Sequence, residues 1–132
     1  MCKGYARVTD VLSKENLIAK LSSGCKAKED WRIGTEHEKF GFKKKDLRPI
    51  SFDDIQKIFS ELCSKYKWEK IIENRKIIGL KKDATSITLE PGGQIELSGA
   101  PVKNLFETCK EVNLHQDELN AVCRNYEIEF MG

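Results

Sequence analysis

The sequence predicts an α+β fold in which an antiparallel sheet is flanked by helices. From Ser86 to Pro101, polar and apolar residues alternate on either side of Pro91-Gly92-Gly93, which is typical of two strands joined by a tight turn. In other stretches apolar residues recur every three or four positions, as they do on one face of a helix. The 132 residues are enough for one hydrophobic core, so we expect 1–132 to form a single domain or part of one.

The first expected element is a helix. Ser13 has the side chain to cap a helix that runs to about Ser23, and Gly24 is suited to end it. Residues 1–12 are only weakly patterned. The apolar face of this helix would consist of Leu17, Ile18 and Leu21.

A long strand is expected over 31–42. In it Glu36 and Glu38 lie two positions apart, so that on a strand they share a face about 6.7 Å apart. The alternation is imperfect, because Phe40 and Phe42 have the same parity as the two carboxylates. A twist or bulge near the end of this segment would turn the chain.

The middle of the chain predicts a second helix and a hairpin. Ser51 caps the helix and Asp54 is placed to complete a capping box. Two strands over 68–73 and 76–82 would turn at Asn74-Arg75. The apolar face of the helix consists of Ile55, Ile58, Phe59, Leu62 and Tyr66.

The two strands around the glycine turn carry Glu90 and Glu96 on their polar face. Pro101 then opens a third helix, expected from Val102 to about Tyr126, followed by a strand over 127–131. No turn, cap or polar tail follows that strand, so we expect 1–132 to be the N-terminal portion of something longer. The apolar face of the third helix would consist of Leu105, Cys109, Val112, Leu119, Val122 and Cys123.

Charge and cysteine content exclude several classes of protein. With 23 basic and 21 acidic residues the net charge is only +2, which does not favour binding to nucleic acid or to a membrane surface. No apolar run approaches the roughly 18 residues of a membrane span, and no signal or transit peptide is visible. The five cysteines form no Cys-x-x-Cys pair, which argues against a disulfide framework and against structural zinc. Reduced thiols are the expectation, and Cys63, Cys109 and Cys123 would pack in the core.

Three motifs suggest a functional site, and each also has a simpler explanation. His37 beside Glu38 does not start a His-Glu-x-x-His zinc motif, because Gly41 occupies the position of the second histidine. His115, the other histidine, is expected at the surface or at a helix cap. Gly92-Gly93 lacks the spacing of a phosphate loop and is expected to be a turn. The four glutamates are either a solvated sheet face or a metal site, and periodicity alone leaves both open.

Three blocks of sequence carry a resemblance to a known family. Residues 32–42 (RIGTEHEKFGF), 78–81 (IGLK) and 89–101 (LEPGGQIELSGAP) resemble signatures of the plant and proteobacterial glutamate–cysteine ligases. Residues 108–113 (TCKEVN) continue the match in the same order and spacing. The resemblance covers roughly 12–132.

The resemblance implies an ATP-dependent ligase that joins the γ-carboxyl of L-glutamate to L-cysteine with Mg²⁺, which is the first step of glutathione biosynthesis. It implies a fold related to glutamine synthetase. It places the carboxylates Glu36, Glu38, Glu90 and Glu96 at the catalytic nucleotide–metal site. Arg32, Lys39 and Gln94 are the candidates for binding the cofactor. These seven residues are the predicted site.

The resemblance also bears on regulation and location. It implies that Cys109 is a redox-active thiol, half of a regulatory disulfide whose partner would lie beyond Gly132, and that the full-length form makes a redox-dependent homodimer. The relatives it indicates are plastid proteins, so the location would be the chloroplast or, without a transit peptide, the cytoplasm. We expect the 132 residues alone to be inactive. The alternative is a non-catalytic domain that binds a nucleotide or a metal, or that docks on a partner.

Overall fold

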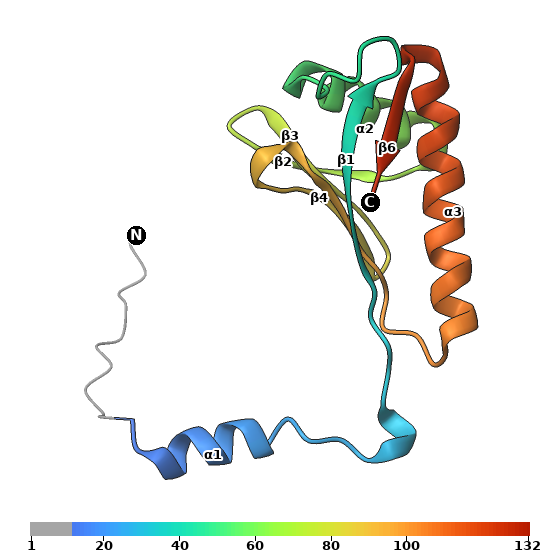
Figure 1. Ribbon diagram of the computed structural model, residues 1–132. Coiled ribbons are helices and arrows are strands. Elements are labelled where there is room, and N and C mark those ends of the chain that lie inside the picture. The colour runs from blue at the N-terminus through green and yellow to red at the C-terminus, as the bar shows by residue number, and fades with distance from the viewer. Residues whose placement is uncertain (1–11) are drawn as a thin grey trace. The chain divides into compact units, whose positions relative to one another are not determined.

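A computed structural model describes residues 12–132 of the chain. They belong to two units, one ending at Trp31 and the other running from Arg32 to Gly132 (Figure 1). The sequence-based expectation of one domain over 1–132 stays an expectation. Cys2 and the weakly patterned N-terminal stretch lie outside the described residues, apart from Leu12.

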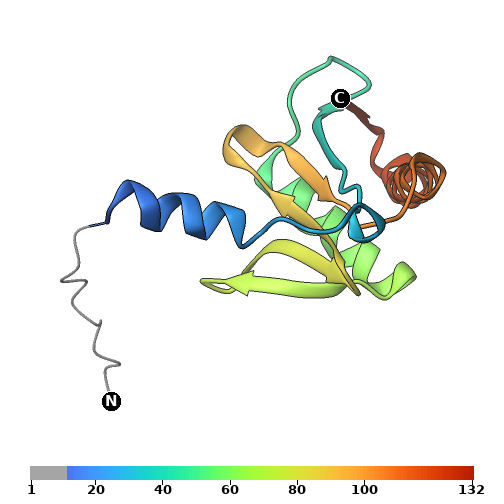
Figure 2. The same cartoon turned by 90° about the horizontal axis from the view of Figure 1, so that it is seen from below.

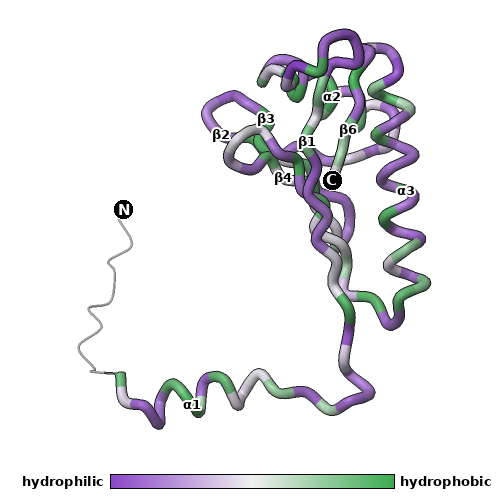
Figure 3. The backbone as a smooth tube through the Cα atoms, viewed as in Figure 1, coloured by the Kyte–Doolittle hydropathy of each residue, from purple (hydrophilic) through white to green (hydrophobic). Residues whose placement is uncertain are grey.

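The first unit contains the helix α1 (Lys14–Ser22) and a short 3₁₀ turn, η1 (Lys28–Asp30). The predicted cap is confirmed: Ser13 accepts from the backbone N–H of Asn16, whose side chain accepts from Ser13 in return. Figure 3 shows hydrophobic and hydrophilic residues interleaved along this helix. Its large apolar residues, Leu17, Ile18 and Leu21, are all more than half exposed, so within its own unit α1 has no core to pack on.

The second unit is built on a six-stranded antiparallel sheet with the order β2-β3-β4-β5-β1-β6. The predicted hairpin and the glycine turn are both present, and the final strand pairs with the end of β1. The strands are β1 (Glu36–Lys43), β2 (Glu69–Glu73), β3 (Lys76–Lys82), β4 (Thr85–Leu89), β5 (Ile95–Ser98) and β6 (Ile128–Met131).

Two helices, α2 (Phe52–Tyr66) and α3 (Leu105–Cys123), bury apolar residues together with one face of this sheet (Figure 2). We call this the inner face and the opposite one the outer face. Strand residues that alternate with the polar positions point inwards, among them Leu80, Ile87 and Leu97, and each is at most 1% exposed. The core therefore lies between the inner face and the two helices.

The third helix begins later than the sequence predicted. A bridge between Ile33 and Val102 keeps the chain extended there, so Pro101 does not open the helix. Asn104 caps it instead, its side chain accepting from the backbone N–H of Glu107. At the other end α3 stops at Cys123, and a short 3₁₀ turn over 124–126 replaces its expected last turn.

Three residue placements on α3 also differ from expectation. His115 is only 2% exposed, because it lies on the helix face turned towards the sheet. Leu105 and Cys109, expected in the core, are exposed because the first turns of α3 present them away from the sheet. Cys123 is buried and Cys63 partly buried, as expected.

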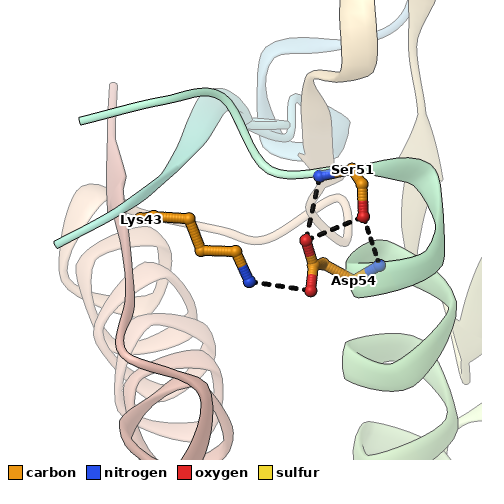
Figure 4. A network of polar contacts seen from close by, with 3 residues as sticks. All are labelled: Lys43, Ser51 and Asp54. Atoms are coloured by element: carbon orange, nitrogen blue, oxygen red, sulfur yellow. Dashed lines mark hydrogen bonds and ion pairs between the residues drawn. The ribbon is translucent and has the colours of Figure 1, made fainter. Parts of the chain in front are cut away.

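The start of α2 is fixed by a polar network (Figure 4). Asp54 accepts from the backbone N–H and the hydroxyl of Ser51, and Lys43 donates to its other oxygen at 2.8 Å. Burial raises the pKa of Asp54, but the hydrogen bonds from Lys43 and Ser51 outweigh it and lower the pKa to about 2. The network joins the end of β1 to the helix that covers the sheet.

We expect Asp54→Asn to lower the free energy of unfolding by about 1–2 kcal/mol at neutral pH, because it removes the charged cap and the ion pair. The folded pKa lies below the ordinary value of about 4, so this stabilisation is present above about pH 4 and is lost as the pH falls towards 2. Urea unfolding at several pH values measures it. Asp53→Asn, at an exposed neighbouring position, is the control, and an equal loss in both variants would contradict the prediction.

Candidate metal and nucleotide site on the outer face

The register of three neighbouring strands gathers carboxylates on the outer face. Glu38 of β1 lies directly opposite Glu96 of β5, which lies opposite Thr88 of β4. Two residues earlier on β1, Glu36 lies opposite Ser98. Residues that face each other on antiparallel strands point to the same side, with side chains about 5 Å apart. Three of the four predicted glutamates therefore share one face.

The fourth, Glu90, lies at the turn between β4 and β5. Its backbone N–H donates to the carbonyl of Gln94, and its carbonyl accepts from Gly93, which closes the turn. Gly92 and Gly93 have φ of +81° and +83°, a conformation that L side chains seldom adopt. Glu90 lies two positions after Thr88, so it belongs to the same face of the strand. The turn therefore holds Glu90 and Gln94 side by side, next to the outer-face carboxylates.

Two hydrogen bonds orient the opposed carboxylates. The side-chain amide of Gln94 donates to Oε2 of Glu38 at 2.6 Å, and the hydroxyl of Ser98 donates to Oε1 of Glu96 at 2.8 Å. Each engages one oxygen of a carboxylate, which leaves the second oxygen available to a ligand. The glycine turn and the register of β5 thus fix the directions of the acidic groups on β1 and β5.

Of the two predicted cationic residues, Lys39 does not join this group. Lys39 points to the inner face and is 2% exposed; its Nζ donates to the backbone carbonyl of His37 at 3.5 Å. Burial lowers the pKa of Lys39 to about 8. Arg32 is exposed and lies ahead of β1, next to the bridge residue Ile33.

A cation that the sequence analysis passed over does lie on the outer face. Lys81, in β3, is paired with Ser86 of β4, which is in turn opposite Ser98. It forms an exposed ion pair of 3.0 Å with Glu69. The period-two pattern of 76–82 is the signal in the sequence that could have revealed it.

The outer-face carboxylates supply the oxygen ligands that a hard cation such as Mg²⁺ prefers. Magnesium is commonly held by one or two protein carboxylates, with water and phosphate oxygens completing its octahedron. The opposed pair Glu38 and Glu96 supplies two such donors on rigid strands, with Glu36 next to them. Among residues 12–132 no three acidic, histidine or cysteine side chains are gathered into a closed metal cluster. The arrangement suits a cation shared with phosphates better than a cage built from protein alone.

The fold and this face define an α+β domain with an acidic, strand-borne site. Residues 32–132 match Glutamate-cysteine ligase family 2, and the chain belongs to that family. The sequence is 53% identical to the chloroplastic glutamate–cysteine ligase of Brassica juncea over 124 residues, which are 94% of this chain and 24% of that protein.

Other relatives give the same result. Glutamate–cysteine ligase A, chloroplastic, of Oryza sativa subsp. japonica is 53% identical over 126 residues, 96% of this chain and 26% of the relative. The chloroplastic enzyme of Arabidopsis thaliana is 52% identical over 124 residues, 94% and 24% of the two chains. The chain spans about a quarter of the length of these curated relatives. In the described part of the chain, no helix is long and apolar enough to cross a bilayer.

We expect Gly93→Ala to destabilise the protein by about 1 kcal/mol and to loosen the Gln94–Glu38 contact, because alanine is strained at this positive φ. Open space surrounds the position, so no clash contributes. Gly34→Ala is the control, since that glycine also faces open space but has no positive φ. Thermal unfolding measures the effect; equal midpoints for Gly93→Ala and the wild-type protein would contradict it.

Proposed function

We propose that this chain supplies the nucleotide–metal part of a glutamate–cysteine ligase, which joins the γ-carboxyl of L-glutamate to the amine of L-cysteine in the first step of glutathione biosynthesis. The observation that carries the proposal is Glu38 lying opposite Glu96, with Glu36 on the same face, in a member of this family. The fold that completes the enzyme would be of the glutamine-synthetase type. Support for this is the antiparallel sheet that carries the acidic residues on one face and helices on the other.

The reaction explains why such a face is needed. A carboxylate is a poor acylating agent until ATP converts it to an acyl phosphate, here γ-glutamyl phosphate, which the amine of cysteine then attacks with loss of phosphate. Transfer of the phosphoryl group requires its charge to be neutralised and its oxygens to be held in line, which Mg²⁺ provides when bound. Glu36, Glu38 and Glu96 would hold the cation, and Gln94 keeps Glu38 turned towards it. Glu90 completes the acidic edge at the turn.

Cationic side chains near the phosphates are the second requirement. Lys81 is the candidate on the outer face, because it shares a cross-strand row with Ser86, Ser98 and Glu36. Arg32 stays a candidate through the family signature that contains it. Lys39 would act from the inner face by holding the β1 strand, since its ammonium group is buried away from the carboxylates.

Redox control is a further part of the proposal. Cys109 is exposed on α3, so an oxidant or a partner thiol can reach it, whereas Cys123 is buried and burial raises its thiol pKa to about 12. The described cysteines are free thiols. A disulfide from Cys109 would act in the longer protein, where it would govern a redox-dependent homodimer. The relatives' names suggest the plastid as the location.

We expect the 132-residue chain alone to form no γ-glutamylcysteine from ATP, glutamate and cysteine, because it spans only about a quarter of its relatives. A longer chain containing the same residues should form it. Product detection by mass spectrometry measures both. Product from the pure short chain would contradict the expectation, and no product from the longer one would favour a non-catalytic nucleotide- or metal-binding domain.

In that longer chain, Glu38→Gln and Glu96→Gln should each reduce turnover by about 10²–10³-fold and raise the Mg²⁺ concentration needed for half-maximal rate. Glutamine keeps the shape of glutamate and removes its charge, so the fold should be retained. Glu73→Gln, at an exposed position of β2, is the matched control and should leave both quantities unchanged. Wild-type Mg²⁺ dependence in both site variants would show that the carboxylates are merely a solvated face.

A further inference from the structure

Strand β1 carries two phenylalanines on the same face as its carboxylates. Phe40 and Phe42 have the parity of Glu36 and Glu38, and the sequence predicted that a twist or bulge would turn the chain near them. The strand instead pairs with β5 and then with β6 without a register shift. Both phenylalanines therefore stay on the outer face, on which the nucleotide–metal site is proposed.

The alternation of burial agrees with this orientation. Lys39 and Gly41 are buried on the inner face, whereas Phe40, which lies between them, is 53% exposed. Met131 lies opposite Phe40 on β6 and is 70% exposed. A sheet face that meets only water normally carries polar side chains at such positions. We call Phe40 and Met131 the apolar pair.

The apolar pair borders the carboxylates directly. Phe40 follows Glu38 by two positions on the same face of β1, so the two side chains leave the strand about 6.7 Å apart. Strand β6 runs beside this end of β1 (Figure 1), and Gly132, the residue after Met131, lies against the backbone of Glu38. A group held between Glu38 and Glu96 would therefore have the apolar pair beside it.

The other side of these carboxylates has a different character. There Glu36 and Ser98 face each other, and the same cross-strand row continues through Ser86 to Lys81. Hydroxyl groups and an ammonium group suit the oxygens of phosphates. The opposed carboxylates of β1 and β5 thus lie between a polar, cationic row and the apolar pair.

The proposed reaction gives the two sides different roles. In phosphoryl transfer the attacking and leaving oxygens lie roughly in line, on opposite sides of the transferred group. With the phosphates of ATP on the side of Lys81, the γ-carboxyl of glutamate approaches from the side of the apolar pair. The amine of cysteine, which displaces phosphate from γ-glutamyl phosphate as the C–N bond forms, approaches from that side too. Of the two amino acids, cysteine has the apolar side chain, because a thiol behaves as a small hydrophobic group.

We propose that Phe40 and Met131 form the wall that contacts the side chain of the acceptor amino acid, and that this wall selects a small apolar side chain over one that carries a hydroxyl group. The inference rests on the proposed function, because it names residues that select a substrate of that same reaction. Sulfur packs favourably against an aromatic ring. A serine hydroxyl placed there would lose its hydrogen bonds to water without gaining a comparable partner from either side chain.

The acceptor preference of the longer chain tests the proposal, with L-cysteine, L-2-aminobutyrate and L-serine as acceptors. The ethyl group of 2-aminobutyrate is apolar and close to the cysteine side chain in size. We expect Phe40→Thr and Met131→Gln each to lower the ratio of kcat/KM for cysteine to kcat/KM for serine about tenfold, and 2-aminobutyrate to follow cysteine. The KM for ATP should stay within about twofold of the wild-type value, since the nucleotide lies on the other side of the carboxylates.

Two further variants separate selection from packing. Phe40→Leu keeps an apolar surface and should retain the preference for cysteine within about threefold. Ile72→Thr, at an exposed position of β2, makes a similar change away from the site and should leave the preference unchanged. The preference is a ratio measured on one protein sample, so a lower folded fraction in a variant does not alter it.

An unchanged preference in both Phe40→Thr and Met131→Gln would overturn the inference and show that the apolar pair packs against another part of the longer chain. A raised KM for ATP with an unchanged preference would also overturn it, because the pair would then contact the nucleotide base. No product with any acceptor from the unmodified longer chain would instead overturn the proposed function, and this inference with it, so the two failures are distinguishable.

Discussion

The cross-strand register of β1 and β5 is the constraint on which the rest of this structure depends. Because side chains alternate along a strand, a slip of one residue would turn Glu36 and Glu38 inwards and bring Lys39 to the outer face. The register is held from both sides. Leu97 and Ile95 are at most 1% exposed on the inner face, while the glycine turn ahead of β5 sets where that strand begins.

This register places like charges close together. At an effective dielectric of about 20, two carboxylates about 5 Å apart repel each other by roughly 3 kcal/mol. Donors from Gln94 and Ser98 offset part of that repulsion, and the exposed position of Glu38 lets water screen more of it. A bound cation would relieve the remainder, and this electrostatic argument connects the strand geometry to the proposed nucleotide–metal function. The inner face of the sheet carries the hydrophobic core, and the outer face carries the carboxylates of the proposed site.

Strand parity and cap chemistry were sufficient to predict much of the fold. The capping residues Ser13 and Ser51, the hairpin turn at Asn74-Arg75 and the common face of Glu36 and Glu38 all follow from local rules that tertiary packing does not override. Lys39 has the opposite parity to Glu36 and Glu38, which agrees with its inner position, but the sequence analysis named it only as a cofactor candidate.

Other features depended on packing that the sequence does not display. The helical pattern of α3 does not reveal that the bridge at Val102 delays its start, or that its first turns expose Leu105 and Cys109. His115 lies among polar neighbours in the sequence, so nothing local indicates that α3 turns it towards the sheet. The partners of Glu111 and Glu118 come from distant segments, which no local pattern could identify.

Paramagnetic broadening by Mn²⁺, which takes the same oxygen ligands as Mg²⁺, tests the central claim most directly. In the isotope-labelled protein with ATP present, low concentrations of Mn²⁺ should broaden the backbone amides of Glu36, Glu38 and Glu96 first. The amides of His115 and Leu119, on the helix that covers the other face, should stay sharp until much higher concentrations. Uniform broadening, or broadening that begins at acidic residues away from β1 and β5, would contradict the account.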